Sequence, residues 1–253
     1  ALAPTFLFSE EVSAWWTQGG SIGMWIETSV DGHCIYLQRG VLISHPVEDN
    51  MSRMRPPVKG QWIWGNAPGT SSLNGHSWPG NRYSYDLAIY KEGKPYEGDG
   101  KDNDDHYCWN PPQKAYCMAD GKVMEAIDNV PDNKGNTGKL PDGTNPPGNS
   151  RVVIEHDFNG VKYYSIYAHV RQGSIPVHLK PTAGSPNPLV KAGEPIGLVG
   201  NAGDTGGPHL HLGFYRKDMY GRIRSRPLFF RDLKSLTDEL IFGTPQGHVE
   251  YIS

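Results

Sequence analysis

The sequence predicts a mostly β fold, and three observations support this. Short apolar runs recur along the chain, and turn residues separate them; the 253 residues include 31 Gly and 21 Pro. Aromatic strand formers are frequent, with 13 Tyr and 7 Trp. A disordered chain would have fewer aromatics and a larger net charge. We expect a β-rich N-terminal extension at 1–58, packed on a main domain at 59–253.

Composition excludes two classes of partner. The chain has 24 Lys+Arg against 27 Asp+Glu, a net charge of −3, so no basic field points to nucleic acid. No apolar run approaches the ~20 residues that a membrane-spanning helix needs. Ala1-Leu2-Ala3-Pro4 does not begin a signal peptide, since no basic segment and apolar core follow it. We expect neither nucleic acid nor a membrane span.

The first sixty residues contain one hairpin signal. Asp31-Gly32 lies between the apolar stretches 23–28 and 34–38, and this dipeptide favours a tight turn between strands. Residues 9–17 predict a short helix capped by Ser9. Residues 61–66 predict the first strand of the main domain.

The stretch 82–90 alternates large apolar and small or polar residues, which predicts a strand. Ser84, Asp86 and Ala88 fall on one face, opposite the aromatic and aliphatic side chains. A carboxylate in so apolar a strand requires a partner charge, hydrogen bonds or a metal ion. Asp86 is therefore a candidate functional residue.

Two further hairpins are predicted beyond the polar loop 91–113. Asp120-Gly121 separates 115–119 from 122–127, and Asn159-Gly160 separates 152–156 from 162–170. In the last of these strands, alternation places His169 on the same face as Tyr163, Ser165 and Tyr167. The segment 227–233 predicts a terminal helix or turn.

The three cysteines allow one short disulfide. Cys108 and Cys117 bracket a loop that a disulfide could close, which leaves Cys34 over. The alternative is three reduced thiols. No Cys-x-x-Cys pair is present, so thiolate ligation of zinc is not expected.

A His-x-His motif follows a glycine-rich loop. Gly207-Pro208-His209-Leu210-His211-Leu212 reads as a strand, in which His209 and His211 point to one side and the leucines to the other. A catalytic zinc takes three N or O ligands and leaves a fourth position for water. The candidates for such a site are His76, Asp86, His169, His209 and His211.

These motifs resemble the lysostaphin-like (LytM-type) zinc endopeptidases of bacterial cell walls. The likeness rests on Asp86 in Tyr83-Ser84-Tyr85-Asp86-Leu87-Ala88, on Tyr167-Ala168-His169, and on the His-x-His motif with its loop. It covers roughly residues 60–216.

The resemblance implies an antiparallel β-sheet groove of the duplicated-hybrid-motif type, with Zn²⁺ held by His76, Asp86 and His211. His169 and His209 would carry protons and stabilise the tetrahedral intermediate. One departure stands out, because the family's first histidine commonly lies four residues before the aspartate, where this chain has Arg82. Gly75-His76 matches the variant of the family with a longer insertion.

The function so implied is cleavage of peptide bonds in peptidoglycan, in the stem peptide or the cross-bridge. We expect an extracytoplasmic monomer, secreted or periplasmic, whose leader has been removed. Two alternatives remain. The first is a catalytically silent module of the same fold that binds cell wall or activates another hydrolase. The second is a β-sandwich that binds sugars through Trp15, Trp16, Trp25, Trp62 and Trp64.

Overall fold

The computed structural model describes residues 25–26, 33–38, 41–46, 54–65, 76, 80–81, 83–226, 228, 230–235, 240–243 and 249–252. Before residue 54 and after residue 230, it describes the backbone of the strands. The predicted N-terminal helix at 9–17 and the turn at Asp31-Gly32 lie outside these residues. The strands on either side of that turn do pair as predicted, with Trp25 opposite Tyr36.

The described residues are mostly β and all strand pairs are antiparallel, which confirms the predicted fold class. The strands are β1 (Trp25–Ile26), β2 (His33–Gln38), β3 (Val41–Pro46), β4 (Gln61–Gly65), β5 (Tyr85–Ala88), β6 (Lys114–Tyr116), β7 (Gly121–Ile127), β8 (Arg151–Phe158), β9 (Val161–Ala168), β10 (Leu189–Val190), β11 (Pro195–Leu198), β12 (Leu210–Lys217), β13 (Ile223–Ser225), β14 (Phe230–Ser235), β15 (Leu240–Gly243) and β16 (Val249–Ile252). Three 3₁₀ turns, η3 (Asn103–Asp105), η4 (Gly135–Thr137) and η5 (Val177–Leu179), lie in the loops. None of the described helices is long and apolar enough to cross a membrane.

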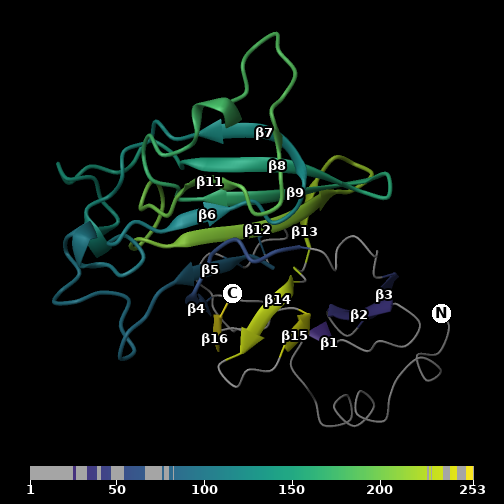
Figure 1. The fold of residues 1–253 in the computed structure, drawn as a ribbon, viewed down its shortest axis with the longest axis horizontal. Coiled ribbons are helices and arrows are strands. Elements are labelled where there is room, and N and C mark those ends of the chain that lie inside the picture. The colour runs from purple at the N-terminus through teal and green to yellow at the C-terminus, as the bar shows by residue number, and fades with distance from the viewer. Residues whose placement is uncertain are drawn as a thin grey trace.

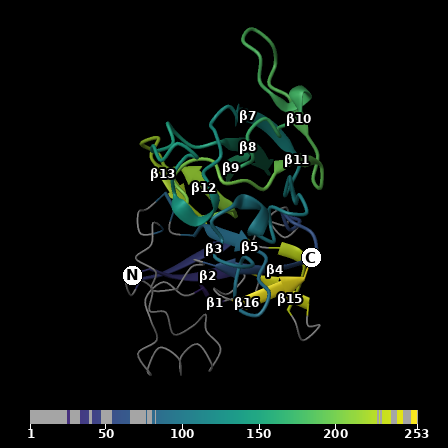
Figure 2. The same cartoon turned by 90° about the vertical axis from the view of Figure 1, so that its left-hand side faces the viewer.

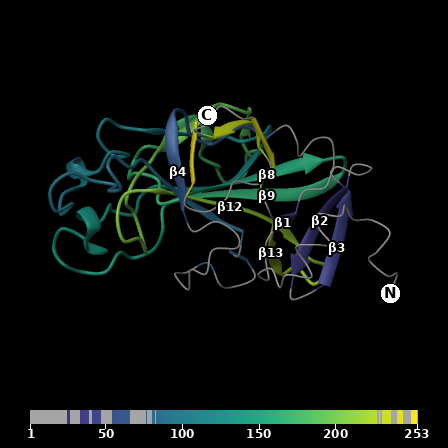
Figure 3. The ribbon, with the colours of Figure 1, turned by 90° about the horizontal axis from the view of Figure 1, so that it is seen from below.

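One large sheet organises the chain. Eleven strands form it, in the order β10-β7-β8-β9-β12-β5-β4-β16-β14-β15, with β13 paired to β12. Figure 1 shows β7, β8, β9 and β12 side by side, and Figure 2 views the same strands from one end. From below, β4 crosses β8 and β9 at a steep angle, as expected of a strongly twisted sheet (Figure 3).

Alternation decides which face of the sheet is buried. On β9, Tyr163, Ser165 and Tyr167 share one face, as the sequence predicts, and the structure shows that this face is buried. Leu212 on β12 pairs with Tyr167. The hydrophobic core lies on this face. The β8–β9 hairpin turns at Asn159 and Gly160 with φ of 53° and 83°, the conformation that the Asn-Gly signal predicts.

The predicted hairpin around Asp120-Gly121 is wrong. β6 pairs with β11, whereas β7 pairs with β8 and β10. Gly121 belongs to β7, and a Cβ there would lie 2.5 Å from Ile154 Cγ2 and 2.6 Å from the Glu155 carbonyl oxygen. This glycine therefore permits close packing against β8 rather than a turn.

One other prediction also fails. The segment predicted to form a terminal helix or turn at 227–233 contributes to β14, which pairs with β15 and β16. Of the two alternatives for Cys108 and Cys117, the structure shows reduced thiols, both free and buried. Each thiol donates instead to a carbonyl, Cys108 to Pro208 and Cys117 to Ala119, both at 2.9 Å.

We predict that neither Cys108 nor Cys117 reacts with an alkylating reagent in the native protein, and that both react after unfolding. Burial raises the pKa of each thiol to about 12, so the reactive thiolate is scarce as well as inaccessible. Peptide mapping by mass spectrometry gives the modification at each cysteine. Recovery of a linked Cys108–Cys117 peptide from unreduced protein would contradict this.

The Tyr167 hydroxyl satisfies a buried backbone N–H, because it accepts a hydrogen bond of 2.9 Å from the backbone amide of Met118. Tyr167→Phe leaves that N–H without its acceptor and should lower the free energy of unfolding by about 1–3 kcal/mol. Tyr164→Phe on the same strand is the control. It removes a partly exposed bond to Glu155 and should change stability by no more than about 0.5 kcal/mol. Urea denaturation measures both changes. Equal losses of unfolding free energy in the two variants would show that the buried bond to Met118 contributes no more to stability than the partly exposed bond to Glu155.

Candidate metal centre

Asp86 and His211 face each other across two neighbouring strands. β5 and β12 are antiparallel partners, and the register places His211 directly opposite Asp86. Tyr85, Leu87, Leu210 and Leu212 are fully buried on the core side, so alternation sends Asp86 and His211 to the other face. His211 Nδ1 lies 2.9 Å from Asp86 Oδ1.

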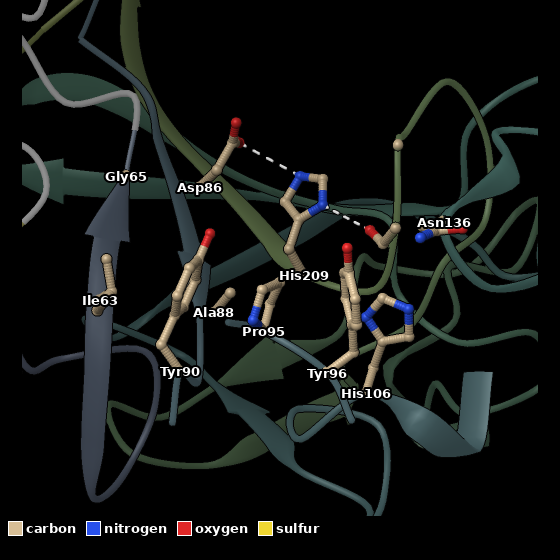
Figure 4. Close-up of a pocket in the computed structure, with 12 residues that line it drawn as sticks. Ile63, Gly65, Asp86, Ala88, Tyr90, Pro95, Tyr96, His106, Asn136 and His209 are labelled. Carbon is tan, nitrogen blue, oxygen red and sulfur yellow. Dashed lines mark hydrogen bonds and ion pairs between the residues drawn. The ribbon is translucent and has the colours of Figure 1, made fainter. Parts of the chain in front are cut away.

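Two more histidines reach the same carboxylate from outside the regular strands. His76 Nε2 lies 3.5 Å from Asp86 Oδ2, and His209 Nε2 lies 3.3 Å from Asp86 Oδ1. Each ring is oriented by a backbone carbonyl that accepts a hydrogen bond from its Nδ1: Ser84 at 3.2 Å for His76 and Gly207 at 2.9 Å for His209. Figure 4 shows His209 directed at Asp86.

His169 reaches the site because it departs from strand alternation. It follows the end of β9, where its φ of 62° lies in the left-handed region. The predicted shared face with Tyr163, Ser165 and Tyr167 is therefore wrong for His169. Its ring lies 4.7 Å from that of His209 and 5.9 Å from that of His211 instead. Its Nδ1 donates to the Ala202 carbonyl at 2.9 Å, which leaves Nε2 to serve the site.

Gly200 permits the close approach of the two segments that carry His169 and His209. A Cβ on Gly200 would lie 2.3 Å from the Arg171 amide nitrogen and 2.6 Å from the His169 carbonyl oxygen. Gly200 also pairs with His209 as an isolated bridge. Only glycine fits between these two backbones.

Burial and mutual charge set the protonation of the cluster. Burial raises the pKa of Asp86, but the charge and hydrogen bond of His209, with hydrogen bonds from His211 and His76, bring it well below its usual value. Burial and the neighbouring histidines lower the pKa of His169 to about 3. Burial lowers the pKa of His211 despite Asp86, whereas for His209 the attraction of Asp86 outweighs burial and raises it. An anionic Asp86 carboxylate thus lies beside His169 and His211, whose lowered pKa values favour the neutral imidazole that binds metal, whereas the raised pKa of His209 favours its protonated form beside Asp86.

Among the residues that the structure describes, two overlapping sets could hold a metal ion. One is His76, Asp86 and His211, the other is His169, His209 and His211, and within each the ligand atoms lie within 4.8 Å of one another. A tetrahedron with metal–ligand bonds of about 2.0–2.2 Å has edges of about 3.3–3.6 Å. The His76–Asp86 distance of 3.5 Å fits such an edge, and the His211–Asp86 distance of 2.9 Å is slightly shorter. The donor set fits zinc, and all five predicted residues lie together.

A cavity of about 240 Å³ opens beside Asp86 and His209 (Figure 4). Its other lining residues are small or aromatic for the most part: Ile63, Gly65, Ala88, Tyr90, Pro95, Tyr96, His106, Asn136, Gly206 and Gly207. Among the described residues that line the cavity, Asp86 is the only carboxylate and there is no Lys or Arg. This described part of the wall suits an uncharged chain next to the candidate metal ligands.

Sequence reasoning missed His106 in this cavity wall. It belongs to the segment interpreted as a polar surface loop, yet it is only 2% exposed, and its Nε2 donates to the Gly100 carbonyl at 3.0 Å. Its Nδ1 has no hydrogen-bond partner among the described residues, and burial lowers its pKa. Gly98 and Gly100, both with positive φ, were the available signal that the loop is tightly folded.

Comparison with the sequence models of protein families gives a match over part of the chain. Residues 110–222 match the sequence model of Peptidase family M23. His169, His209 and His211 lie inside this match, whereas His76 and Asp86 precede it. No curated protein matches the chain.

Several solved structures are similar at low identity. The catalytic domain of lysostaphin from Staphylococcus simulans is 18% identical with a TM-score of 0.34, over 66% of this chain and 87% of that one. The catalytic domain of the prophage-encoded M23 protein EnpA from Enterococcus faecalis is 15% identical with a TM-score of 0.35, over 67% and 92%. A zinc-containing peptidase from Vibrio cholerae is 18% identical with a TM-score of 0.32, over 76% and 48%.

Proposed function

We propose, from the match of residues 110–222 to the sequence model of Peptidase family M23, that the protein is a zinc-dependent endopeptidase of bacterial cell-wall peptidoglycan. It cleaves a peptide bond in the stem peptide or the cross-bridge and acts outside the cytoplasm, as M23 peptidoglycan hydrolases generally do. We assign the peptidase domain to 59–253, and the place of β4 and β5 in the same sheet as the matched segment supports this assignment.

One observation carries the proposal. His76 and Asp86 lie outside the family match, yet both side chains converge on His211, which lies inside it. Two imidazoles and a carboxylate are one of the ligand sets used by catalytic zinc in peptidases. A structural zinc site would need a fourth protein ligand, whereas three ligands leave a position open for water.

Each residue has a separate task in the proposed reaction. His76, Asp86 and His211 would hold the zinc ion, which would supply Lewis acidity towards the scissile carbonyl and lower the pKa of a water molecule. His169 and His209 exchange protons with the attacking water and the leaving amine. His169 Nδ1 donates to a backbone carbonyl, which leaves its Nε2 available for proton transfer. His209 Nδ1 also donates to a carbonyl, and its Nε2 lies 3.3 Å from Asp86 Oδ1, so this ring holds its proton beside the carboxylate. The cavity beside Asp86 receives the uncharged peptide backbone next to the scissile bond.

We predict that zinc binding separates the two possible ligand sets. The wild-type protein should bind one zinc ion per chain. His76→Ala, Asp86→Ala and His211→Ala should each weaken binding by more than the ~10–100-fold typical of outer-shell changes. His169→Ala should keep the affinity within about tenfold of wild type for the same reason. Calorimetric titration of metal-free protein measures both.

The control for that titration is His178, because it is exposed and its Nε2 lies within hydrogen-bond distance of Glu194 Oε1, at 3.0 Å. His178→Ala should bind zinc as the wild type does. Retained binding in His76→Ala with lost binding in His169→Ala would assign the metal to His169, His209 and His211 instead.

We predict that the zinc-loaded protein releases new amine termini from purified peptidoglycan and from defined muropeptides. His169→Ala should retain its zinc but lose about 10²–10⁴-fold in kcat, the usual contribution of a general acid or base. His178→Ala should cleave at the wild-type rate. Mass spectrometry of the products identifies the bond that is cut. Stoichiometric zinc without turnover in the wild type would instead indicate a silent module of the same fold.

A further inference from the structure

Two adjacent residues on the loop after β7, Asp132 and Asn133, contact both segments that carry the proton-transferring histidines. From these contacts we infer that Asp132 is a positioning residue for His169 and that Asn133 is a positioning residue for His209. The inference rests on the proposed function in one respect, since that function gives the two histidines their task. The contacts themselves are independent of it.

Asp132 bridges two backbones through its two carboxylate oxygens. Its Oδ1 accepts a hydrogen bond from the backbone amide of Asn201 at 2.7 Å, and its Oδ2 accepts one from the backbone amide of Gln172 at 2.9 Å. Gln172 lies three residues after His169, and Asn201 immediately precedes Ala202. The carboxylate therefore ties the segment that leaves His169 to the segment that supplies its hydrogen-bond acceptor.

The Ala202 carbonyl is the link from Asp132 to the chemistry. It accepts the Nδ1 proton of His169, and Asp132 forms an isolated bridge with Ala202. This hydrogen bond fixes the tautomer of His169, because a carbonyl oxygen can only accept. With Nδ1 protonated, the lone pair is on Nε2, the nitrogen available to take a proton. If Ala202 shifts, this preference weakens.

Asn133 acts on the next part of the same loop. Its side chain is fully buried, and Nδ2 donates to the Gly203 carbonyl at 2.7 Å and contacts the Thr205 carbonyl at 3.4 Å. The backbone amide of Asn133 donates to the backbone carbonyl of Asn201 at 2.9 Å. Thr205 Oγ1 in turn lies 3.1 Å from His209 Nδ1 and donates to the Gly207 carbonyl at 2.7 Å.

Nearby Asp128 provides a matched comparison. It too follows β7 and bonds the segment after His169, since its Oδ2 accepts from the Ile175 amide at 3.0 Å and its Oδ1 from Lys180 Nζ at 2.8 Å. Within the part of the chain that the structure describes, its side chain makes no hydrogen bond with 200–207. Loss of Asp128 should therefore affect stability as loss of Asp132 does, without reaching the histidines.

We predict that Asp132→Ala lowers kcat by about 10–100-fold, the range seen when an outer-shell partner is removed. KM and zinc affinity should stay within about twofold, because no proposed ligand or cavity residue changes. Asp132→Asn preserves the shape and one acceptor, and it should fall between Asp132→Ala and the wild type. Asp128→Ala should lose comparable thermal stability but keep the wild-type kcat. The inference is wrong if Asp128→Ala and Asp132→Ala lose equal activity.

A spectroscopic measurement tests positioning without any activity. In zinc-loaded protein labelled with ¹⁵N-histidine, His169 and His209 should each show a protonated Nδ1, assigned with His169→Gln and His209→Gln. Asp132→Ala should turn His169 into a mixture of tautomers and leave His209 unchanged, whereas Asn133→Ala should do the reverse. An unchanged His169 tautomer in Asp132→Ala and Asp132→Asn would overturn the inference.

The two measurements also separate this inference from the proposed function. If the wild type cleaves no peptidoglycan but Asp132→Ala still shifts the His169 tautomer, the proposed function fails and the positioning role stands. If the wild type cleaves and the tautomers do not respond, the reverse holds.

Discussion

The site depends on one cross-strand pair, Asp86 opposite His211. Antiparallel register fixes these two residues on the open side of β5 and β12, and fully buried neighbours on the core side prevent either strand from slipping. A one-residue shift would turn both side chains into the core, where the carboxylate would lack a partner. The hydrophobic core therefore places the two donors, and the loops only need to bring the remaining imidazoles to a fixed carboxylate.

The loops achieve this through backbone contacts rather than through further strands. His76, His169 and His209 each donate from Nδ1 to a carbonyl, so each ring is oriented by main chain. A backbone carbonyl fixes the orientation of a ring only as firmly as the segment that contains it is itself fixed. This explains why a left-handed residue at His169, the contact at Gly200 and the buried amides of Asn133 and Asn201 cluster around the site. The non-regular backbone there is held by side-chain hydrogen bonds.

Strand periodicity in the sequence predicted those features of the site that pairing within the β-sheet determines. It gave the orientation of Asp86 and of His211 with His209, and the β8–β9 hairpin, because these follow from alternation and a specific turn dipeptide. It failed where a single backbone angle or a contact with a distant segment determines the local structure. Alternation ends at His169, which has a left-handed φ, and Gly121 packs against β8 instead of forming a turn. The Cys108 thiol donates a hydrogen bond to the Pro208 carbonyl. His106 could not be found, because its burial depends on packing against residues far along the chain. His76 came from resemblance alone, and its spacing from Asp86 follows no strand rule.

The division of the five residues along the chain has a physical consequence. The segment matched to the family contains three imidazoles but no carboxylate of the cluster, and β5, which precedes it, supplies Asp86. Three neutral imidazoles leave the full charge of a divalent cation uncompensated, whereas Asp86 reduces it and also attracts the cation before any ligand bond forms. β5 in turn is held between β12 and β4, so the strand that supplies the negative charge is fixed on both edges. The charge balance of the site thus requires pairing between strands that lie far apart in the sequence, and a motif confined to the histidine segment describes only part of it.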